Sequence, residues 1–212
     1  MTSVAISADC RTVVTGSEDK TAKLWDVASG QCTATLAGHS GGVSGVAMSA
    51  DGLTIVTGSE DRTARLWDMA SGPCTAMFIG HSGWVSSVAI SADGRTVATG
   101  SDDKTAKLWD AASERCTVTL TGHSRSVESV AMSADGQTVV TGSNDKTEKV
   151  WDVASGQCTA TLTGHSGGVS KVVVSADGRT VASSSYDKTA RVWDTASGQC
   201  NGHIYRPFRH GP

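Results

Sequence analysis

The sequence predicts an all-β fold, a β-propeller of five four-stranded antiparallel blades with a 42-residue period. The first observation is a tryptophan at this constant interval, found at Trp25, Trp67, Trp109, Trp151 and Trp193. The second is an aspartate that keeps the same interval, at Asp19, Asp61, Asp103, Asp145 and Asp187. A period of about 40–45 residues is typical of one propeller blade, whereas helical repeats are mostly shorter or contain helix-forming stretches.

One period, residues 43–84, shows how four strands arise. Residues 43–49 form a short apolar segment, which ends at a turn where Gly52 can take a positive φ. Residues 54–59 are rich in β-branched side chains, and residues 63–68 alternate apolar with polar side chains. Residues 74–79 supply the last strand. Four strands in each period predict one small sheet per period.

These sheets are expected to form a single domain, residues 1–212. The predicted blades cover about residues 1–42, 43–84, 85–126, 127–168 and 169–210. Each small sheet has two apolar faces, and it cannot bury both of them by itself. Neighbouring blades are therefore expected to stack face to face around an axis.

The charge balance gives no reason to expect nucleic acid or an anionic membrane as partner. Lys and Arg total 18 against 21 Asp and Glu, and the formal net charge is -3. Apolar runs are far too short to cross a bilayer, and the first ten residues do not resemble a secretory signal. We expect an intracellular, cytoplasmic protein.

Five of the six cysteines repeat with the blades, at Cys32, Cys74, Cys116, Cys158 and Cys200. Each begins a segment in which apolar residues alternate with threonine, which is the pattern of a half-buried strand. We therefore expect each of these cysteines to face a core as a small hydrophobic residue, with redox or metal-binding roles as the alternatives.

Two dipeptides recur in fixed order. Gly-His occurs at Gly38-His39, Gly80-His81, Gly122-His123 and Gly164-His165, and Trp-Asp begins at each of the five periodic tryptophans. With these pairs the chain resembles the WD-repeat β-propeller family over nearly its whole length. The resemblance implies a buried hydrogen-bond relay in each blade, from the turn Asp through the His to a Ser or Thr on the second strand and then to the Trp indole.

Four sets in this sequence have all members of that relay. They are His39, Thr57, Asp61 and Trp67; His81, Thr99, Asp103 and Trp109; His123, Thr141, Asp145 and Trp151; and His165, Ser183, Asp187 and Trp193. The first blade has Thr15, Asp19 and Trp25 without a preceding Gly-His. A buried imidazole or indole without a partner costs about 1–3 kcal/mol, so the relay is expected to stabilise the blades.

The same residue types imitate a hydrolase triad, and residues 38–42 match the G-x-S-x-G pattern of a nucleophile elbow. That elbow requires a strand-to-helix turn, whereas here the pattern lies between predicted strands and recurs at residues 164–168. One histidine per blade also spreads the imidazoles around the ring. We therefore predict no catalytic residue, no metal site and no cofactor.

Functional signals are expected where the repeats differ. The positions at which the blades vary include Trp84, Arg125, Glu128, Lys171 and Tyr186. In the resembled family these loops flank one rim of the ring, where protein partners commonly dock. The leading hypothesis is therefore a non-enzymatic scaffold that binds a protein or peptide through these residues. A lectin-like or small-ligand-binding propeller is the alternative, but it predicts the same aromatic residue in every blade, and a hydrolase is the third hypothesis.

Closure of the ring is open at this stage. Most propellers of the resembled family have about seven blades, so five predict an incomplete or open ring, a tightened ring, self-association, or further blades that complete it. Three positions depart from the pattern. In the first blade Cys10 replaces a turn glycine, in the third blade Glu114 replaces another, and Pro207 lies in an atypical segment, residues 201–210. We expect the first and last blades to be the least stable.

Overall fold

Each period of the sequence forms one antiparallel four-stranded sheet in the computed structural model, which describes residues 1–69 and 74–205. Within these ranges all regular secondary structure is β-strand. The strands of each sheet follow the order of the chain, so that every strand pairs with the next one along the sequence. The predicted all-β class, the four strands per blade and the 42-residue period are confirmed.

The blades have the following strands. Blade 1 contains β1 (Ser3–Ile6), β2 (Thr12–Gly16), β3 (Thr21–Asp26) and β4 (Cys32–Ala37). Blade 2 contains β5 (Val43–Met48), β6 (Thr54–Ser59), β7 (Thr63–Asp68) and β8 (Cys74–Ile79). Blade 3 contains β9 (Val85–Ile90), β10 (Thr96–Ser101), β11 (Ala106–Asp110) and β12 (Cys116–Leu120). Blade 4 contains β13 (Val127–Met132), β14 (Thr138–Ser143), β15 (Thr147–Asp152) and β16 (Cys158–Thr163). Blade 5 contains β17 (Val169–Val174), β18 (Thr180–Ser185), β19 (Thr189–Asp194) and β20 (Cys200–Tyr205).

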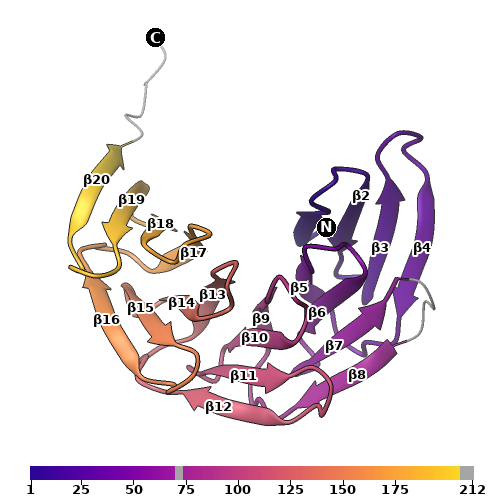
Figure 1. Ribbon diagram of the computed structural model, residues 1–212, viewed down its shortest axis with the longest axis horizontal. Coiled ribbons are helices and arrows are strands. Elements are labelled where there is room, and N and C mark those ends of the chain that lie inside the picture. Colours follow the sequence, from indigo (N-terminus) through magenta and orange to yellow (C-terminus); the bar gives the residue numbers. More distant parts are fainter. Residues whose placement is uncertain (70–73, 206–212) are drawn as a thin grey trace.

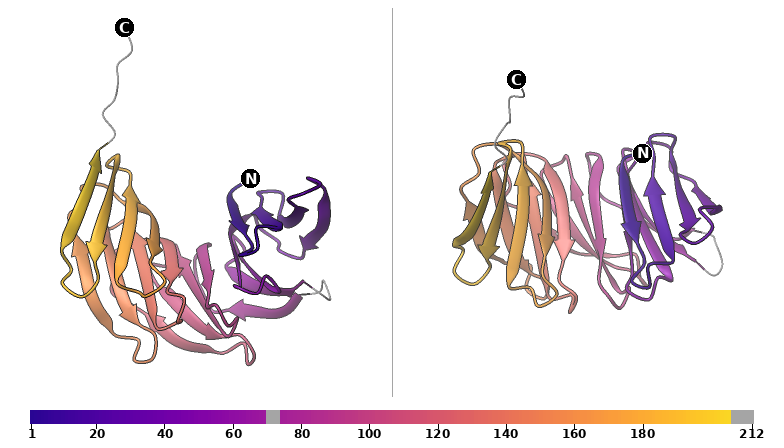
Figure 2. Two further views of the ribbon diagram at one scale, coloured as in Figure 1. Left: turned by 45° about the horizontal axis from the view of Figure 1, so that its top comes forward. Right: turned by 90° about the horizontal axis from the view of Figure 1, so that it is seen from above.

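The five blades form an open arc. The first strand of each blade lies on the inside of the arc and the fourth on the outside (Figure 1). Blade 1 and blade 5 stand at opposite ends with a gap between them, as the turned views in Figure 2 also show. The described sheets therefore do not close into a ring, which agrees with the expectation of an open or incomplete propeller.

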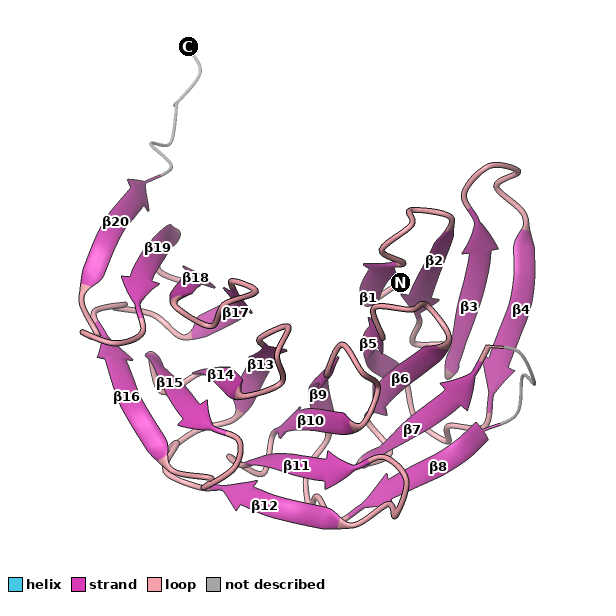
Figure 3. Cartoon of the chain, in the orientation of Figure 1, coloured by secondary structure: helices cyan, strands magenta, loops and turns pink. Residues whose placement is uncertain are grey.

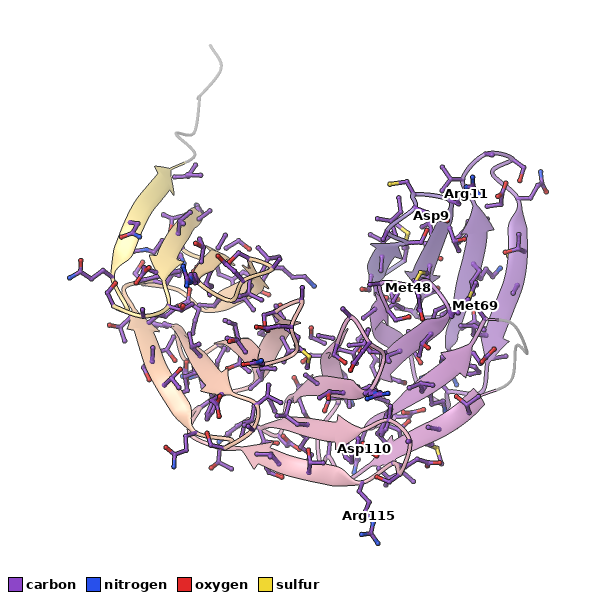
Figure 4. All side chains as sticks on the ribbon, viewed as in Figure 1. Asp9, Arg11, Met48, Met69, Asp110 and Arg115 are labelled. Atoms are coloured by element: carbon purple, nitrogen blue, oxygen red, sulfur yellow. The ribbon has the colours of Figure 1, made fainter. Side chains whose placement is uncertain are left out.

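Tight turns connect the strands, and several of them place a residue in the left-handed region. In the first hairpin Cys10 has a φ of 59°, where the later blades have glycine. Asp9 and Arg11 flank it (Figure 4), and the Asp9 carboxylate accepts the Arg11 backbone N–H at 3.0 Å. A non-glycine residue in this region costs about 1 kcal/mol. Glu114, at a φ of 59°, carries the same strain in the third blade's outer turn.

Each blade packs its two faces differently. We call the face toward the following blade the forward face and the face toward the preceding blade the rear face. At the junction of blades 1 and 2, the forward face supplies Val14, Ala22, Leu24 and Leu36, and the rear face supplies Val43, Val46, Ile55 and Trp67. Met48 and Met69 pack at the border of this cluster (Figure 4). The same register positions form the cores of the other three junctions.

A glycine on the second strand allows this close approach. A Cβ placed at Gly58 would lie 2.8 Å from Cγ1 of both Val85 and Val88 in the next blade. Gly16, Gly100 and Gly142 meet the following blade at similar distances. Because β-carbons do not approach other carbons so closely, these positions require glycine wherever a blade follows.

The prediction that the repeated cysteines face a core is wrong for most of them. Cys32, Cys116, Cys158 and Cys200 are exposed, and Cys74 is half-buried. Each stands at the first position of an outermost strand, on the same side as the buried leucine or phenylalanine but beyond the neighbouring blade's cover. Alternation identified the face correctly, but it could not show how far the neighbour reaches along the strand.

The chain's last described strand is regular. Residues Cys200–Tyr205 pair with β19 in the usual register, although this segment departs from the pattern in sequence. Pro207 and the turn residue Gly72 lie outside the described residues. The described part of the chain contains no helix that could span a membrane.

Candidate functional site

The loop between two blades carries a histidine into the next blade. At the first junction, His39 Nδ1 lies 2.8 Å from Asp61 Oδ2, and His39 Nε2 lies 2.7 Å from Thr57 Oγ1. The Trp67 indole donates to the same Thr57 oxygen at 2.9 Å. The structure thus brings together all four members of the set named from the sequence. The side chain of His39 is 1% exposed.

The other three sets have the same geometry. The His–Asp distances are 2.7 Å for His81, 2.8 Å for His123 and 2.8 Å for His165. The distances from His Nε2 to the hydroxyl are 2.7 Å to Thr99, 2.8 Å to Thr141 and 3.0 Å to Ser183. Each hydroxyl also accepts from its tryptophan, namely Trp109, Trp151 and Trp193, at 2.9 Å.

These bonds have one consistent direction. An indole N–H can only donate, so Thr57 Oγ1 accepts from Trp67. An ionised Asp61 can only accept, so Nδ1 of His39 is protonated and donates to it. In a neutral imidazole with its proton on Nδ1, Nε2 accepts from the Thr57 hydroxyl.

The pKa shifts agree with this assignment. Burial lowers the pKa of His39, His81 and His123 below 6.5 and outweighs the opposing effect of each aspartate partner. Burial raises the pKa of Asp61, but hydrogen bonds, with Thr63 and His39 the strongest donors, hold it at about 2. A carboxylate and a neutral imidazole thus coexist across the physiological range.

The rim of the arc contains a cavity of about 440 Å³ at the inner ends of blades 2, 3 and 4. Trp84, which is 52% exposed, lines it together with Glu60, Asp102, Glu128 and Asn144. The Glu128 carboxylate accepts from Ser126 Oγ at 2.7 Å and from the Asn144 amide. Burial, with a further contribution from Asp103, raises the pKa of Asp102.

The structure brings only two of the five rim candidates into this cavity. Trp84 and Glu128 line it, whereas Lys171 is exposed on blade 5 beside a separate cavity of about 240 Å³. Tyr186 is 66% exposed in the loop between β18 and β19. Arg125 is exposed, and its carbonyl accepts from Ser143 Oγ at 3.2 Å. Lys171 belongs to β17, where it lines the separate cavity together with Ala182 and Ser184. The five residues therefore do not form a single patch.

Comparison with known families agrees with this architecture. The family described as "WD domain, G-beta repeat" matches residues 1–26, 30–68, 72–110, 114–152 and 156–194. The chain belongs to the WD40 family. Members of this family are in general protein-interaction scaffolds without catalytic activity, so the WD-repeat assignment supports a binding role at this level.

A human relative matches one stretch of the WD40 repeats. Human WD repeat-containing protein 86 is 53% identical over 36 residues, which are 17% of this chain and 10% of the human protein. The matched stretch therefore spans about a tenth of that relative's length. This similarity is shorter than one 42-residue repeat, so it concerns the blade itself.

The relay geometry does not offer a nucleophile to a substrate. Thr57 is fully buried, and its oxygen already accepts the Trp67 indole N–H. A hydrolytic serine must instead be accessible and stand beside donors for an oxyanion. The WD40 relay thus orients the histidine loop and fastens it to the following blade.

One buried side chain, Glu148 of β15, was not predicted from the sequence as a residue of interest. It is 0% exposed, and neither carboxyl oxygen is in hydrogen-bond geometry with a described residue. Its Oε1 lies 3.6 Å from Nε2 of His165. Aligning the periods could have revealed it, because the corresponding residues of the other WD40 blades are Ala22, Ala64, Ala106 and Ala190. Burial raises the pKa of Glu148 to about 7.

Proposed function

We propose that this WD40 chain is a non-enzymatic scaffold that presents its rim to a protein or peptide partner. The observation that carries the proposal is the contrast between a repeated interior and a varied rim. The junction cores and relays recur at the same positions, whereas Trp84 is half-exposed at a position held by glycine or serine in three other blades.

The rim cavity favours a basic partner. Glu60, Asp102 and Glu128 surround the exposed indole of Trp84, and no Lys or Arg lines this cavity among the described residues. A cationic side chain could lie on the indole while the carboxylates balance its charge. Arg125, Lys171 and Tyr186 lie outside this cavity and would contact more distant parts of the same partner.

The proposal includes no catalytic residue, metal or cofactor. It also ranks above a lectin-like propeller, because the register position of Trp84 holds Gly42, Ser126 and Gly168 in other blades. A set of equivalent sugar sites would need an aromatic platform in each blade.

We place this function inside the cell, in the cytoplasm. All six cysteines are free thiols, and five of them are exposed. Such a set of accessible thiols is typical of proteins kept in a reducing compartment, since oxidising compartments favour disulfides.

A peptide library displayed on phage tests the rim hypothesis with the full chain as bait. We expect enrichment of peptides rich in Lys or Arg, which lose at least about tenfold in affinity on Trp84→Ser. Ile79→Ser is the matched control, since Ile79 is 66% exposed on the outer strand β8. Equal binding of the enriched peptides to the Trp84→Ser variant would contradict the proposal.

A further inference from the structure

The rear face of blade 1 differs from every other rear face because it is open. Val4 is 60% exposed, whereas its counterparts at the junctions, Val46, Val88, Val130 and Val172, are at most 7% exposed. Trp25 is half-buried, while the other four relay tryptophans are 1–3% exposed. This face stands at one end of the arc (Figure 3).

A cavity of about 330 Å³ opens on this face beside Thr15, Asp19 and Trp25. In blades 2 to 4, the imidazole of the preceding Gly-His lies against the same three residue types, and in blade 5 a serine replaces the threonine. The cavity therefore coincides with the histidine position of the relay.

The remaining members of the relay already have their bonded geometry. The Trp25 indole donates to Thr15 Oγ1 at 2.9 Å, as Trp67 does to Thr57. Asp19 Oδ1 accepts from the Thr21 backbone N–H at 3.0 Å and from its hydroxyl at 2.6 Å. Asp61 holds Thr63 at the same two distances in blade 2. Blade 1 thus presents a preorganised acceptor for an imidazole.

We propose that the rear face of blade 1 is a docking site for a further WD-type blade whose last strand runs into Gly-His. Its apolar forward face covers Val4, Val13 and Trp25, and its histidine enters the cavity. There, Nδ1–H donates to Asp19, and Nε2 accepts the Thr15 hydroxyl proton. Four junctions of this chain show the same pairing of faces.

A second copy of this chain does not supply that blade. The forward face of blade 5 carries Ser184 where the other blades have glycine. At Gly58, a Cβ would lie 2.8 Å from the Cγ1 of Val88, the counterpart of Val4, so Ser184 would collide with Val4 in a head-to-tail pair. In sequence, Pro207 stands in the register of the Gly-His histidine, although it lies outside the described residues.

The test extends the full chain by one blade. A copy of residues 85–126 placed directly before Met1 keeps the 42-residue spacing and brings its own Gly122-His123 to the cavity. Hydrogen exchange of the Trp25 indole N–H and of the β1–β3 amides is then compared with the 212-residue chain. We expect the exchange to slow by about 100-fold.

The matched control is the same extended chain with His123→Ala in the added copy only. We expect this control to lose at least about tenfold of the added protection. Unchanged exchange at Trp25 in the extended chain, or equal protection with and without the added histidine, would overturn the proposal. A 212-residue chain that is a multimer by light scattering and becomes monomeric on Val4→Asp would also overturn it, because a second copy would then cover this face.

Discussion

The junction of blades 3 and 4 and the junction of blades 4 and 5 are built from the same parts but differ in one pair. At the first, Ala106 belongs to the junction core, and the His123–Thr141 distance is 2.8 Å. At the second, Glu148 replaces the alanine and Ser183 replaces the threonine, and the His165–Ser183 distance is 3.0 Å. The serine lacks the methyl of a threonine, and this makes room for part of the larger carboxyl side chain.

The replacement of alanine by Glu148 also adds an ionisable group to this junction. Glu148 is surrounded by the junction core, with Ser183, Arg191 and Trp193 as the nearby groups that favour its ionised form. Burial outweighs them and raises the pKa to about 7. The junction of blades 3 and 4, the regular junction, therefore stabilises the fold through its relay. The junction of blades 4 and 5, the second junction, has the same relay, but its buried Glu148 destabilises the fold when it is ionised.

The largest effect is expected from His123→Ala at the regular junction. The change leaves a cavity and removes the partner of both Thr141 and Asp145, so we expect the free energy of unfolding to fall by about 4 kcal/mol. Urea unfolding measures this, and Ser124→Ala at the exposed neighbour is the control. A loss below about 1 kcal/mol would mean that the relay contributes little.

The next effect is the pH dependence of the second junction. The pKa of Glu148 rises from 4.5 to about 7 on folding, so the stability that it contributes is present below pH 4.5 and is lost as the pH rises through about 7. We expect Glu148→Gln to gain roughly 3 kcal/mol over wild type at high pH and much less at low pH.

Urea unfolding of both proteins at a series of pH values checks this sign. The comparison with wild type isolates Glu148 from His165 and Arg191, which face it from the loop after β16 and from β19. A difference that stays constant with pH would show that Glu148 does not titrate in this range.

A smaller effect is the coupling between Glu148 and Ser183. Ser183→Thr should destabilise wild type by overpacking, whereas in a Glu148→Ala background it should restore the regular junction. We expect a coupling energy of about 2 kcal/mol in a double-mutant cycle. The matched cycle at Ala106 and Thr141, changed to Glu and Ser, should give the same coupling; additivity at both junctions would reject the volume argument.

The smallest effect is the loss of stability at acidic pH that the relay histidines of the first three junctions cause. The pKa values of His39, His81 and His123 are lowered from 6.5 by burial, so the stability they contribute is present above pH 6.5 and is lost as the pH falls through their folded values. Nitrogen NMR of the imidazoles should show the neutral form with the proton on Nδ1 at pH 6.5. A doubly protonated ring at that pH would contradict the relay direction.

The sequence by itself determined the blades and the membership of the relays. A period of 42 residues, alternating strands and turn glycines are local signals, and a blade needs only contacts within one period and with its neighbour. His39 and Asp61 could be paired before any coordinates because the same spacing recurs in later blades.

Only the tertiary structure decided how far each contact reaches. Alternation placed Cys32 on the correct side of its strand, but the adjacent blade leaves it exposed. Trp84 and Glu128 share one cavity, whereas Lys171 lies apart on β17 beside a separate cavity of blade 5. The burial of Glu148 and the exposure of Val4 likewise depend on whether a neighbouring blade covers that face. The residues adjacent in sequence do not determine this.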